Sequence, residues 1–341
     1  MANLFYAAFV PGFQDYIAEL VKERLADAAI KKLLEGAILF ETECTYDKLN
    51  FFCFNNIFAV IDVLENAAKD KALEAHIRKT LGKPSSIISE NNSKIRSFRI
   101  IFSIENKPSA VNEAAKQEAE NFISHASGLK IDRSNPDTEF WYLYRREGFS
   151  LFMKRLTRHA SFEKSLHPGE LSPQLAWLLC RLSNPKHTDT VIDPFCGYGS
   201  IPGQRIKYFP LKKFYAFDID KAPLAFAKKK ITAKQPCEIK QADIYSIFDV
   251  LPRGEADAII TDPPWGMFRE TEIPLQKFYD DMVGIFSRLL KAGGLAVVLT
   301  AKQEEFRQAV DKTPAFSLIR TIPVLVSGKK AAVFVLENHF V

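Results

Sequence analysis

The chain has 341 residues, of which 47% are apolar and 26% charged, so it can fill two or three ordinary cores and is not generally disordered. A formal net charge of +5 and a pI of about 8.8 suit a polyanionic partner, but many enzymes are equally basic. No apolar segment approaches the roughly 18 residues that span a bilayer, and the N-terminal segment lacks the basic start of a signal peptide. We therefore predict a soluble, cytoplasmic protein without a membrane partner.

The cysteines and histidines do not form a framework for disulfides or metals. The five cysteines are odd in number and scattered, and no two have CxxC spacing: Cys44, Cys53, Cys180, Cys196 and Cys237. The six histidines show no metal-binding spacing. We therefore predict a reducing compartment and no bound metal. We also expect a monomer.

The first half of the chain does not alternate regularly between strand and helix. Its apolar patterns predict, in order, strand 4–10, helix 14–27, strand 37–43, strand 56–64, strand 98–104 and helix 111–126. An aromatic and basic segment follows at 140–156. This order predicts one or two small α+β modules with antiparallel sheets, which meet the second half of the chain near residues 157–170.

The second half alternates strictly between strand and helix. Strands are predicted at 190–195, 213–218, 237–243, 256–262 and 295–301, with helices at 221–231, 274–291 and 302–312. Gly293 and Gly294 are predicted to end the long helix. Strands at 316–326 and 331–338 form a closing hairpin. The alternation predicts an α/β fold, a doubly wound and mostly parallel sheet with an antiparallel hairpin at one edge.

A glycine-containing loop, DPFCGYGS, follows the first of these strands and opens a helix. Gly197 and Gly199 would let a ligand approach the backbone, although a tight strand-to-helix turn alone also explains them. The loop lacks GxGxxG and the GK[ST] of a phosphate-binding loop. It begins with a carboxylate, Asp193, which repels phosphates and favours an ammonium group.

Two more acids follow the next two strands. Asp218 ends its strand, where a carboxylate can accept both hydroxyls of a ribose, and Asp243 is placed to meet an adenine amino group. Each acid alone could be a helix N-cap, which is the role expected of Asp220. Together with Asp193, they favour S-adenosylmethionine, whose ammonium, ribose and adenine each match one acid.

The fourth strand leads into TDPPWG. Prolines fix φ and remove N–H donors, so Pro263 and Pro264 leave carbonyls available beside the carboxylate of Asp262. Such an acceptor pair suits an amino group, and accepting its hydrogens directs its lone pair towards an electrophilic methyl group. Trp265 offers a face on which an extruded base can stack. A plain turn with a core tryptophan is the simpler alternative.

These segments resemble a known family. DPPW is similar to the [D/N]PP[F/Y/W] motif of amino-group methyltransferases, DPFCGYGS to their first motif, and LHPGELSPQLAWLLCRL to the segment that closes over the methionine part of the cofactor. With SFRIIFSIENKP, SNPDTEFW and FMKRLTRH upstream, the chain resembles the THUMP-containing RNA methyltransferases that form N2-methylguanosine in tRNA. The resemblance implies a ferredoxin-like module at 1–64, a THUMP-like RNA-binding domain at 65–160 and a methyltransferase domain at 165–341.

The resemblance also implies a set of site residues. Asp262 would accept the amine hydrogens, with Pro263, Pro264 and Trp265 completing the catalytic loop. The cofactor would be bound by His167, Pro168, Asp193, Cys196, Gly197, Gly199, Ser200, Asp218, Ile219, Asp243 and Ile244. The family pattern is commonly DPFCGSGT, so Tyr198 and Ser200 depart from it, and Gln204 stands where an acid often follows.

Two features have competing interpretations. Cys196 and Cys237 are candidate nucleophiles, but one lies in the cofactor loop and the other begins a strand at the opposite end of the sheet, so both are expected to be structural. Between residues 141 and 170, aromatic side chains are interleaved with Arg145, Arg146, Lys154, Arg155, Arg158 and Lys164. This segment as a whole favours a strip that tracks RNA phosphates, while core aromatics with solvated charges are the alternative.

Alternative functions share much of this sequence evidence. The same chemistry could act on guanine in rRNA or on adenine N6 in DNA, although a DNA enzyme would be expected to carry a different recognition domain. A binding adaptor with a degenerate methyltransferase fold is another alternative, against which the intact DPPW argues.

Overall fold

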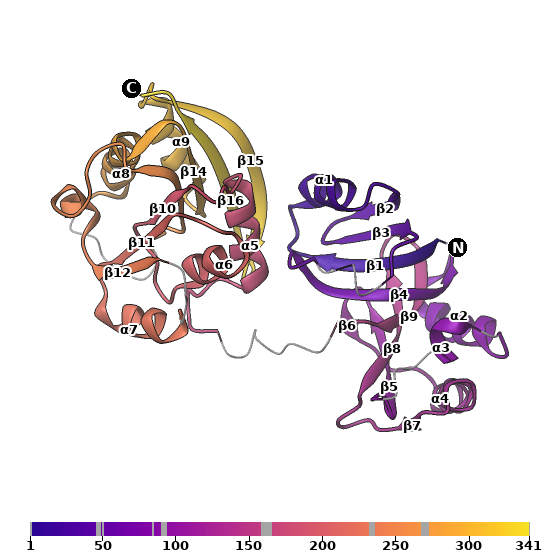
Figure 1. Ribbon diagram of the computed structural model, residues 1–341. Helices are drawn as coiled ribbons and strands as arrows, with labels where there is room; N and C mark the ends of the chain where they lie inside the picture. The colour runs from indigo at the N-terminus through magenta and orange to yellow at the C-terminus, as the bar shows by residue number, and fades with distance from the viewer. Residues whose placement is uncertain are drawn as a thin grey trace. The chain divides into compact units, whose positions relative to one another are not determined.

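The computed structural model describes residues 2–45, 49, 51–83, 85–89, 94–157, 166–231, 236–266 and 273–340. The chain forms two compact units (Figure 1). The first comprises Met1–Phe9 with Gln14–Ala160, and the second comprises Val10–Phe13 with Ser161–Val341. Among the described residues, no helix is long and apolar enough to cross a membrane.

The first unit is built on one nine-stranded sheet in the order β2-β3-β1-β4-β9-β8-β5-β6, with β7 also paired to β5. Its elements are β1 (Asn3–Phe9), α1 (Gln14–Arg24), β2 (Ala29–Leu34), β3 (Ala37–Thr42), β4 (Phe54–Leu64), α2 (Ala72–Thr80), α3 (Ser86–Ser89), β5 (Ser97–Ile104), β6 (Lys107–Pro108), α4 (Glu113–Ser127), β7 (Lys130–Ile131), β8 (Thr138–Arg145) and β9 (Phe149–Arg155). The sheet is continuous because β4 pairs with β9. The predicted boundary after residue 64 falls at the end of β4 and stays a prediction.

The expectation of antiparallel sheets holds for most strand pairs of this unit but was wrong for one pair of long strands. β5 runs parallel to β8, with seven paired residues from Phe98 to Ile104. The reason is that α4 lies between these strands in the chain and carries it back to the starting end of the sheet, as parallel pairing requires. The sequence patterns also missed β2, an edge strand with two lysines, and α2.

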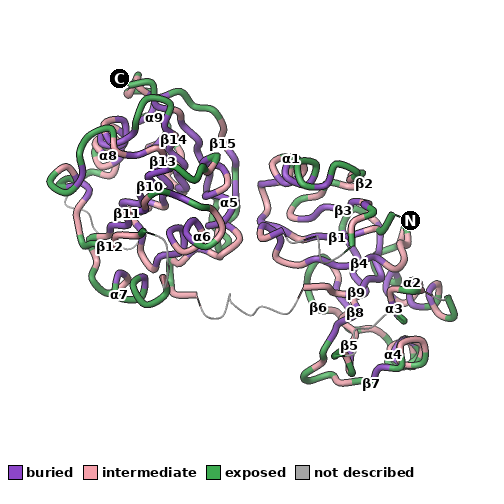
Figure 2. The backbone as a smooth tube through the Cα atoms, viewed as in Figure 1, coloured by how far each residue is buried: buried purple, intermediate pink, exposed green. Residues whose placement is uncertain are grey.

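The aromatic segment at 140–156 is a hairpin of β8 and β9, and its aromatic side chains mainly form core. Tyr142, Tyr144 and Phe152 are buried against apolar residues of α2 and α4, and Figure 2 shows both strands largely buried.

The expectation of a phosphate-tracking strip on this hairpin was wrong for three of its four described cations, while the fourth, Arg146, is exposed and pairs with the exposed Glu35. Arg145 pairs with Glu147, Arg155 pairs with Glu139, and the Lys154 ammonium donates to the Ile87 carbonyl. These three cations already have partners within the protein, so they are not available as free charges for RNA phosphates. Arg158 and Lys164 lie outside the described residues.

The second unit is built on a seven-stranded sheet in the order β12-β11-β10-β13-β14-β16-β15. Its elements are α5 (Pro173–Leu182), β10 (Thr190–Asp193), α6 (Ser200–Tyr208), β11 (Lys213–Asp218), α7 (Lys221–Lys230), β12 (Cys237–Gln241), a 3₁₀ segment (Ile244–Asp249), β13 (Ala256–Thr261), α8 (Leu275–Leu289), β14 (Leu290–Thr300), α9 (Gln303–Asp311), β15 (Phe316–Val326) and β16 (Lys329–Asn338). The first five strands in this order are parallel, and β16 is antiparallel to both neighbours. The doubly wound sheet and its closing hairpin are confirmed.

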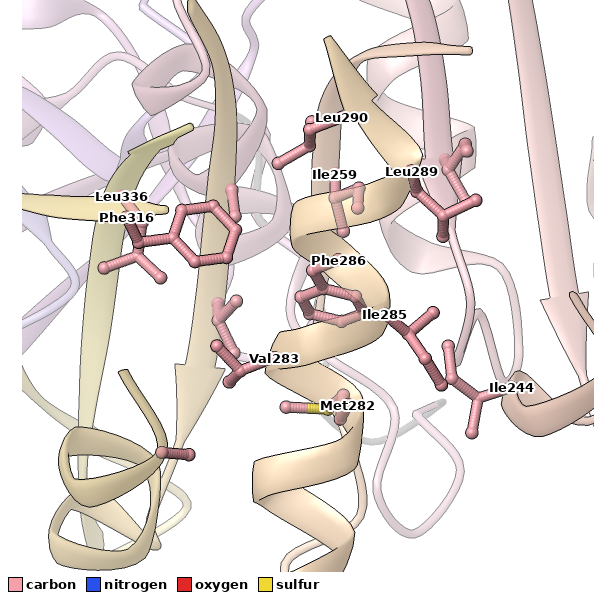
Figure 3. Close-up of a cluster of buried hydrophobic side chains, with 14 of the residues drawn as sticks. Ile244, Ile259, Met282, Val283, Ile285, Phe286, Leu289, Leu290, Phe316 and Leu336 are labelled. Atoms are coloured by element: carbon pink, nitrogen blue, oxygen red, sulfur yellow. The ribbon is translucent and has the colours of Figure 1, made fainter. Parts of the chain in front are cut away.

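The long helix α8 packs on this sheet through an apolar stripe. Met282, Ile285, Phe286 and Leu289 are buried, and Figure 3 shows Phe286 near Ile259 of β13 and Ile285 near Ile244. The helix ends earlier than predicted, because Leu290 already begins β14 and pairs with Ala256. Gly293 and Gly294 therefore do not end the helix. They lie in an irregular stretch of β14, between the residues that pair with Ala256 and Ala258.

Candidate active site

A cavity of about 580 Å³ opens at the carboxyl ends of the parallel strands in the second unit. Asp193 and Asp218 end β10 and β11, and Asp262 follows β13 directly, so the topology gathers these acids at one edge of the sheet. The predicted residues in the cavity wall are Pro168, Asp193, Cys196, Gly197, Ser200, Asp218, Ile219, Asp243, Ile244, Asp262, Pro264 and Trp265. Three predicted residues, His167, Gly199 and Pro263, do not line it.

Asp193 is fully buried and only half satisfied. Its Oδ1 accepts the Thr261 hydroxyl at 2.7 Å and the Phe195 amide at 3.2 Å. Its Oδ2 is buried and has no donor among the described residues. Burial raises the pKa of Asp193 to about 7, although the hydrogen bond from Thr261 opposes this shift. A cation that reached Oδ2 from the cavity would satisfy the orphan oxygen and favour the ionised form.

Asp218 holds the glycine loop in place. Its Oδ2 accepts the Gly197 amide at 2.8 Å, and its Oδ1 accepts the Asp220 amide at 2.9 Å. Asp220 occupies the N-cap position of α7, as expected, but its side chain makes no capping hydrogen bond to the helix, and the residue also lines the cavity. The Asp218 carboxylate therefore has a structural role in the glycine loop, and the ribose contact predicted for it stays a prediction.

Asp243 caps the 3₁₀ segment, because its Oδ1 accepts the Tyr245 amide at 3.0 Å. It also lines the cavity, so the capping role and the ligand role are compatible. Ile219 is 51% exposed, whereas Ile244 is buried, and both lie in the cavity wall. They offer apolar surface beside the polar atoms of Asp218 and Asp243.

The two loop glycines differ in what they permit. A Cβ on Gly199 would lie 2.9 Å from the Cβ of Ala227. The absence of a side chain at Gly199 therefore serves the packing of the loop on α7, and not the approach of a ligand as predicted. Gly197 has no neighbour within 4 Å of such a Cβ. Cys196 is buried, and burial raises the pKa of its thiol, while burial raises that of Cys237 to about 11. Neither thiol is therefore an activated nucleophile.

The TDPPWG segment is fixed from two sides. The Trp265 indole N–H donates to Asp262 Oδ1 at 2.9 Å, and the Tyr279 hydroxyl, which lies 2.8 Å from the Thr300 hydroxyl, donates to the Pro264 carbonyl at 3.2 Å. Burial raises the pKa of Asp262 well above its usual value, against the hydrogen bond from Trp265. Trp265 thus orients the acid, a role that the sequence did not predict.

Sequence reasoning missed several residues of this site. Thr261 and Tyr279 bond to Asp193 and Pro264, and Glu170 lines the cavity. Phe195 and Phe278 meet edge to face in its wall, with ring centroids 5.9 Å apart. Of these residues, Thr261, directly before DPPW, and Glu170, within LHPGELSPQLAWLLCRL, carried a sequence signal. Throughout the described ranges, no three His, Cys, Asp or Glu side chains are grouped as metal ligands.

Comparison with known proteins finds that this chain is similar to methyltransferases. The model of a family described as UPF0020, RMKL-like methyltransferase domain, matches residues 161–329. The chain is 28% identical over 249 residues to the tRNA (guanine(6)-N2)-methyltransferase of Thermus thermophilus, covering 71% of this chain and 72% of that protein.

A second relative is similar over more of the chain. This tRNA (guanine(6)-N2)-methyltransferase of Archaeoglobus fulgidus is 22% identical over 342 residues, covering 90% of this chain and 86% of that protein. The crystal structure of TrmN from Thermus thermophilus is 22% identical, covers 98% of this chain and 99% of that chain, and has a TM-score of 0.80, which shows a shared fold.

Proposed function

We propose that this chain, whose residues 161–329 match the family with the RMKL-like methyltransferase domain, transfers a methyl group from S-adenosylmethionine to the exocyclic N2 amine of a guanosine in tRNA. The observation that carries the proposal is the joint position of two acids. Asp193, with an unpaired oxygen, and Asp262, held by Trp265, line one cavity. One suits a cofactor ammonium and the other a base amine.

The cavity wall fits S-adenosylmethionine. The buried Asp193 Oδ2 lacks a donor within the described part of the chain, and an aminoacyl ammonium would supply one. We assign the ribose hydroxyls to Asp218, the adenine amino group to Asp243, and the apolar faces of adenine to Ile219 and Ile244. The bound cofactor supplies an electrophilic methyl group on a sulfonium.

The chain itself positions and polarises the target base. Asp262 accepts a hydrogen bond from the guanine amine, whose nitrogen lone pair is otherwise delocalised into the ring. This contact favours an orientation in which the lone pair points towards the methyl group of the cofactor. The Trp265 N–H keeps the carboxylate in one orientation. Pro264 lines the cavity, and its carbonyl, which accepts one hydrogen bond from Tyr279, has a second lone pair, so it is our candidate for the second acceptor. Aromatic side chains in the wall offer stacking surface and exclude water.

The substrate follows from the relatives. Relatives from Thermus thermophilus and Archaeoglobus fulgidus are both named for guanine 6 of tRNA, so we propose that position here. We propose that residues 1–64 and 65–160 are the ferredoxin-like and THUMP-like modules that hold this RNA, and that the protein acts as a cytoplasmic monomer.

The test is methyl transfer from labelled S-adenosylmethionine to unmodified total tRNA, followed by nucleoside analysis and site mapping. Labelled N2-methylguanosine at position 6 is the expected result. Label found only in rRNA or DNA would keep the chemistry and overturn the tRNA assignment. Absence of both label and cofactor binding would support the adaptor alternative.

A further inference from the structure

One wall of the cavity is a short segment that precedes α5. Pro168, Gly169, Glu170 and Leu171 all line the cavity. The segment is a tight turn, because the Glu170 amide donates to the His167 carbonyl at 2.9 Å and the His167 amide donates to Glu170 Oε2 at 3.1 Å. The Ser200 hydroxyl of the glycine loop donates to the Leu171 carbonyl at 3.1 Å. This segment, residues 168–171, is called the cavity wall segment below.

Helix α7 holds this segment through an ion pair. Lys230 Nζ lies 2.5 Å from Glu170 Oε1, and the Glu170 side chain is only 6% exposed while that of Lys230 is 45% exposed. Burial raises the pKa of Glu170, but the hydrogen bonds from Lys230 and the His167 amide outweigh it and hold that pKa below its usual value. The carboxylate is therefore ionised and bound from both sides.

The same helix holds the turn through an aromatic cluster. The His167 ring stacks on Tyr198 at 4.3 Å and 5°, and it meets Phe226 of α7 at 4.7 Å. Tyr198 is the glycine-loop residue that replaces the small residue common in the resembled pattern. Phe226 is 49% exposed, and neither Phe226 nor Lys230 lines the cavity. Among the described residues, they contact the cavity-lining Tyr198 and Glu170 and also His167, which directly precedes the segment that lines the cavity.

We propose that Phe226 and Lys230 are positioning residues for cofactor binding, because they fix the cavity wall segment against the glycine loop. The proposal rests on the proposed function, which puts S-adenosylmethionine in this cavity. Without these two contacts, the wall segment samples positions away from the cavity, and each binding event has to restore its position. The affinity for the cofactor therefore falls although no contacting side chain has changed.

The experiment measures S-adenosylhomocysteine binding to the full chain by calorimetry. Lys230→Met is expected to weaken binding about two- to fivefold, as for a partly exposed ion pair. Phe226→Ala is expected to weaken it about two- to tenfold, as for loss of an aromatic contact. Lys229→Met, on the neighbouring exposed lysine of α7, is the matched control and should leave the dissociation constant unchanged. Lys230→Arg and Phe226→Tyr should retain wild-type affinity.

A double-mutant cycle separates positioning from general destabilisation. In a Glu170→Gln background, Lys230→Met should have almost no further effect on affinity, because the pair is already broken. The effect of Lys230→Met should also shrink at high salt, which screens the ion pair. Equal affinities of the wild type, Lys230→Met and Phe226→Ala would overturn this inference alone. Failure of the wild type to bind S-adenosylhomocysteine would overturn the proposed function and this inference with it.

Discussion

Replacing Asp193 by Asn tests the cofactor assignment most directly. The side chain is fully buried, and the Oδ1 bonds from Thr261 and Phe195 can be kept by the amide oxygen. The unpaired Oδ2, however, becomes an NH2 group, so an acceptor for an ammonium becomes a donor. A hydrogen bond to a charged group contributes about 1.5–3 kcal/mol, which corresponds to a loss of roughly 10- to 150-fold in affinity.

The assay compares two ligands by calorimetry. S-adenosylhomocysteine carries the aminoacyl group, whereas 5′-methylthioadenosine lacks it. Asp193→Asn should weaken the first by the stated factor and leave the second within about twofold. Equal losses for both ligands would indicate a general disturbance of the site and refute the assignment. An unchanged affinity for S-adenosylhomocysteine would refute it as well.

The pH dependence gives a second readout of the same carboxyl. Burial raises the pKa of Asp193 to about 7, so the carboxyl is increasingly neutral as pH falls below that value. Only the ionised form pairs with an ammonium. Wild-type affinity for S-adenosylhomocysteine should therefore rise between pH 6 and 8, and that of Asp193→Asn should stay flat.

Three further predictions, with four variants, test other parts of the structure. Asp262→Ala should lower kcat by about 10²- to 10³-fold, as for loss of a positioned catalytic hydrogen bond, and should leave S-adenosylhomocysteine binding unchanged. Weakened binding with normal turnover would contradict a role of Asp262 in accepting the base amine. Gly199→Ala should destabilise the second unit by about 1–3 kcal/mol in thermal unfolding, because its φ is 80° and the new Cβ would lie 2.9 Å from that of Ala227. Gly197→Ala should destabilise it less, because no atom lies within 4 Å of a Cβ there, and equal losses of stability would refute this packing argument. His76 is buried between Ser150 and Asp62, and burial lowers its pKa from 6.5 to about 4. Its contribution to the free energy of unfolding is therefore present above pH 6.5 and is lost as pH falls towards 4, by about 3 kcal/mol in denaturant unfolding. His76→Gln should remove this pH dependence, and an unchanged dependence of stability on pH would exclude His76 as its source.

The sequence by itself determined the fold class of the second unit and the position of most of its candidate site. Strict alternation of strand and helix implies a parallel sheet, and parallel strands present their carboxyl ends at one edge. Asp193, Asp218 and Asp262 could therefore be grouped without coordinates, since each stands at or directly after the end of a strand. Local reasoning favoured an RNA-binding strip on the hairpin of β8 and β9, whereas most of its aromatic side chains form core. A strand pattern does not show which face of the sheet a helix will cover.

Only the tertiary structure decided which partners these residues have. Thr261 lies 68 residues from Asp193 in the chain, and Lys230 lies 60 residues from Glu170. Tyr279 reaches Pro264 from a helix that follows the TDPPWG segment. No local pattern encodes such contacts, because they depend on how helices settle on the sheet and which side chains then meet at its edge. The strand ends bring the acids together, and packing determines which oxygen of Asp193 is left for a ligand.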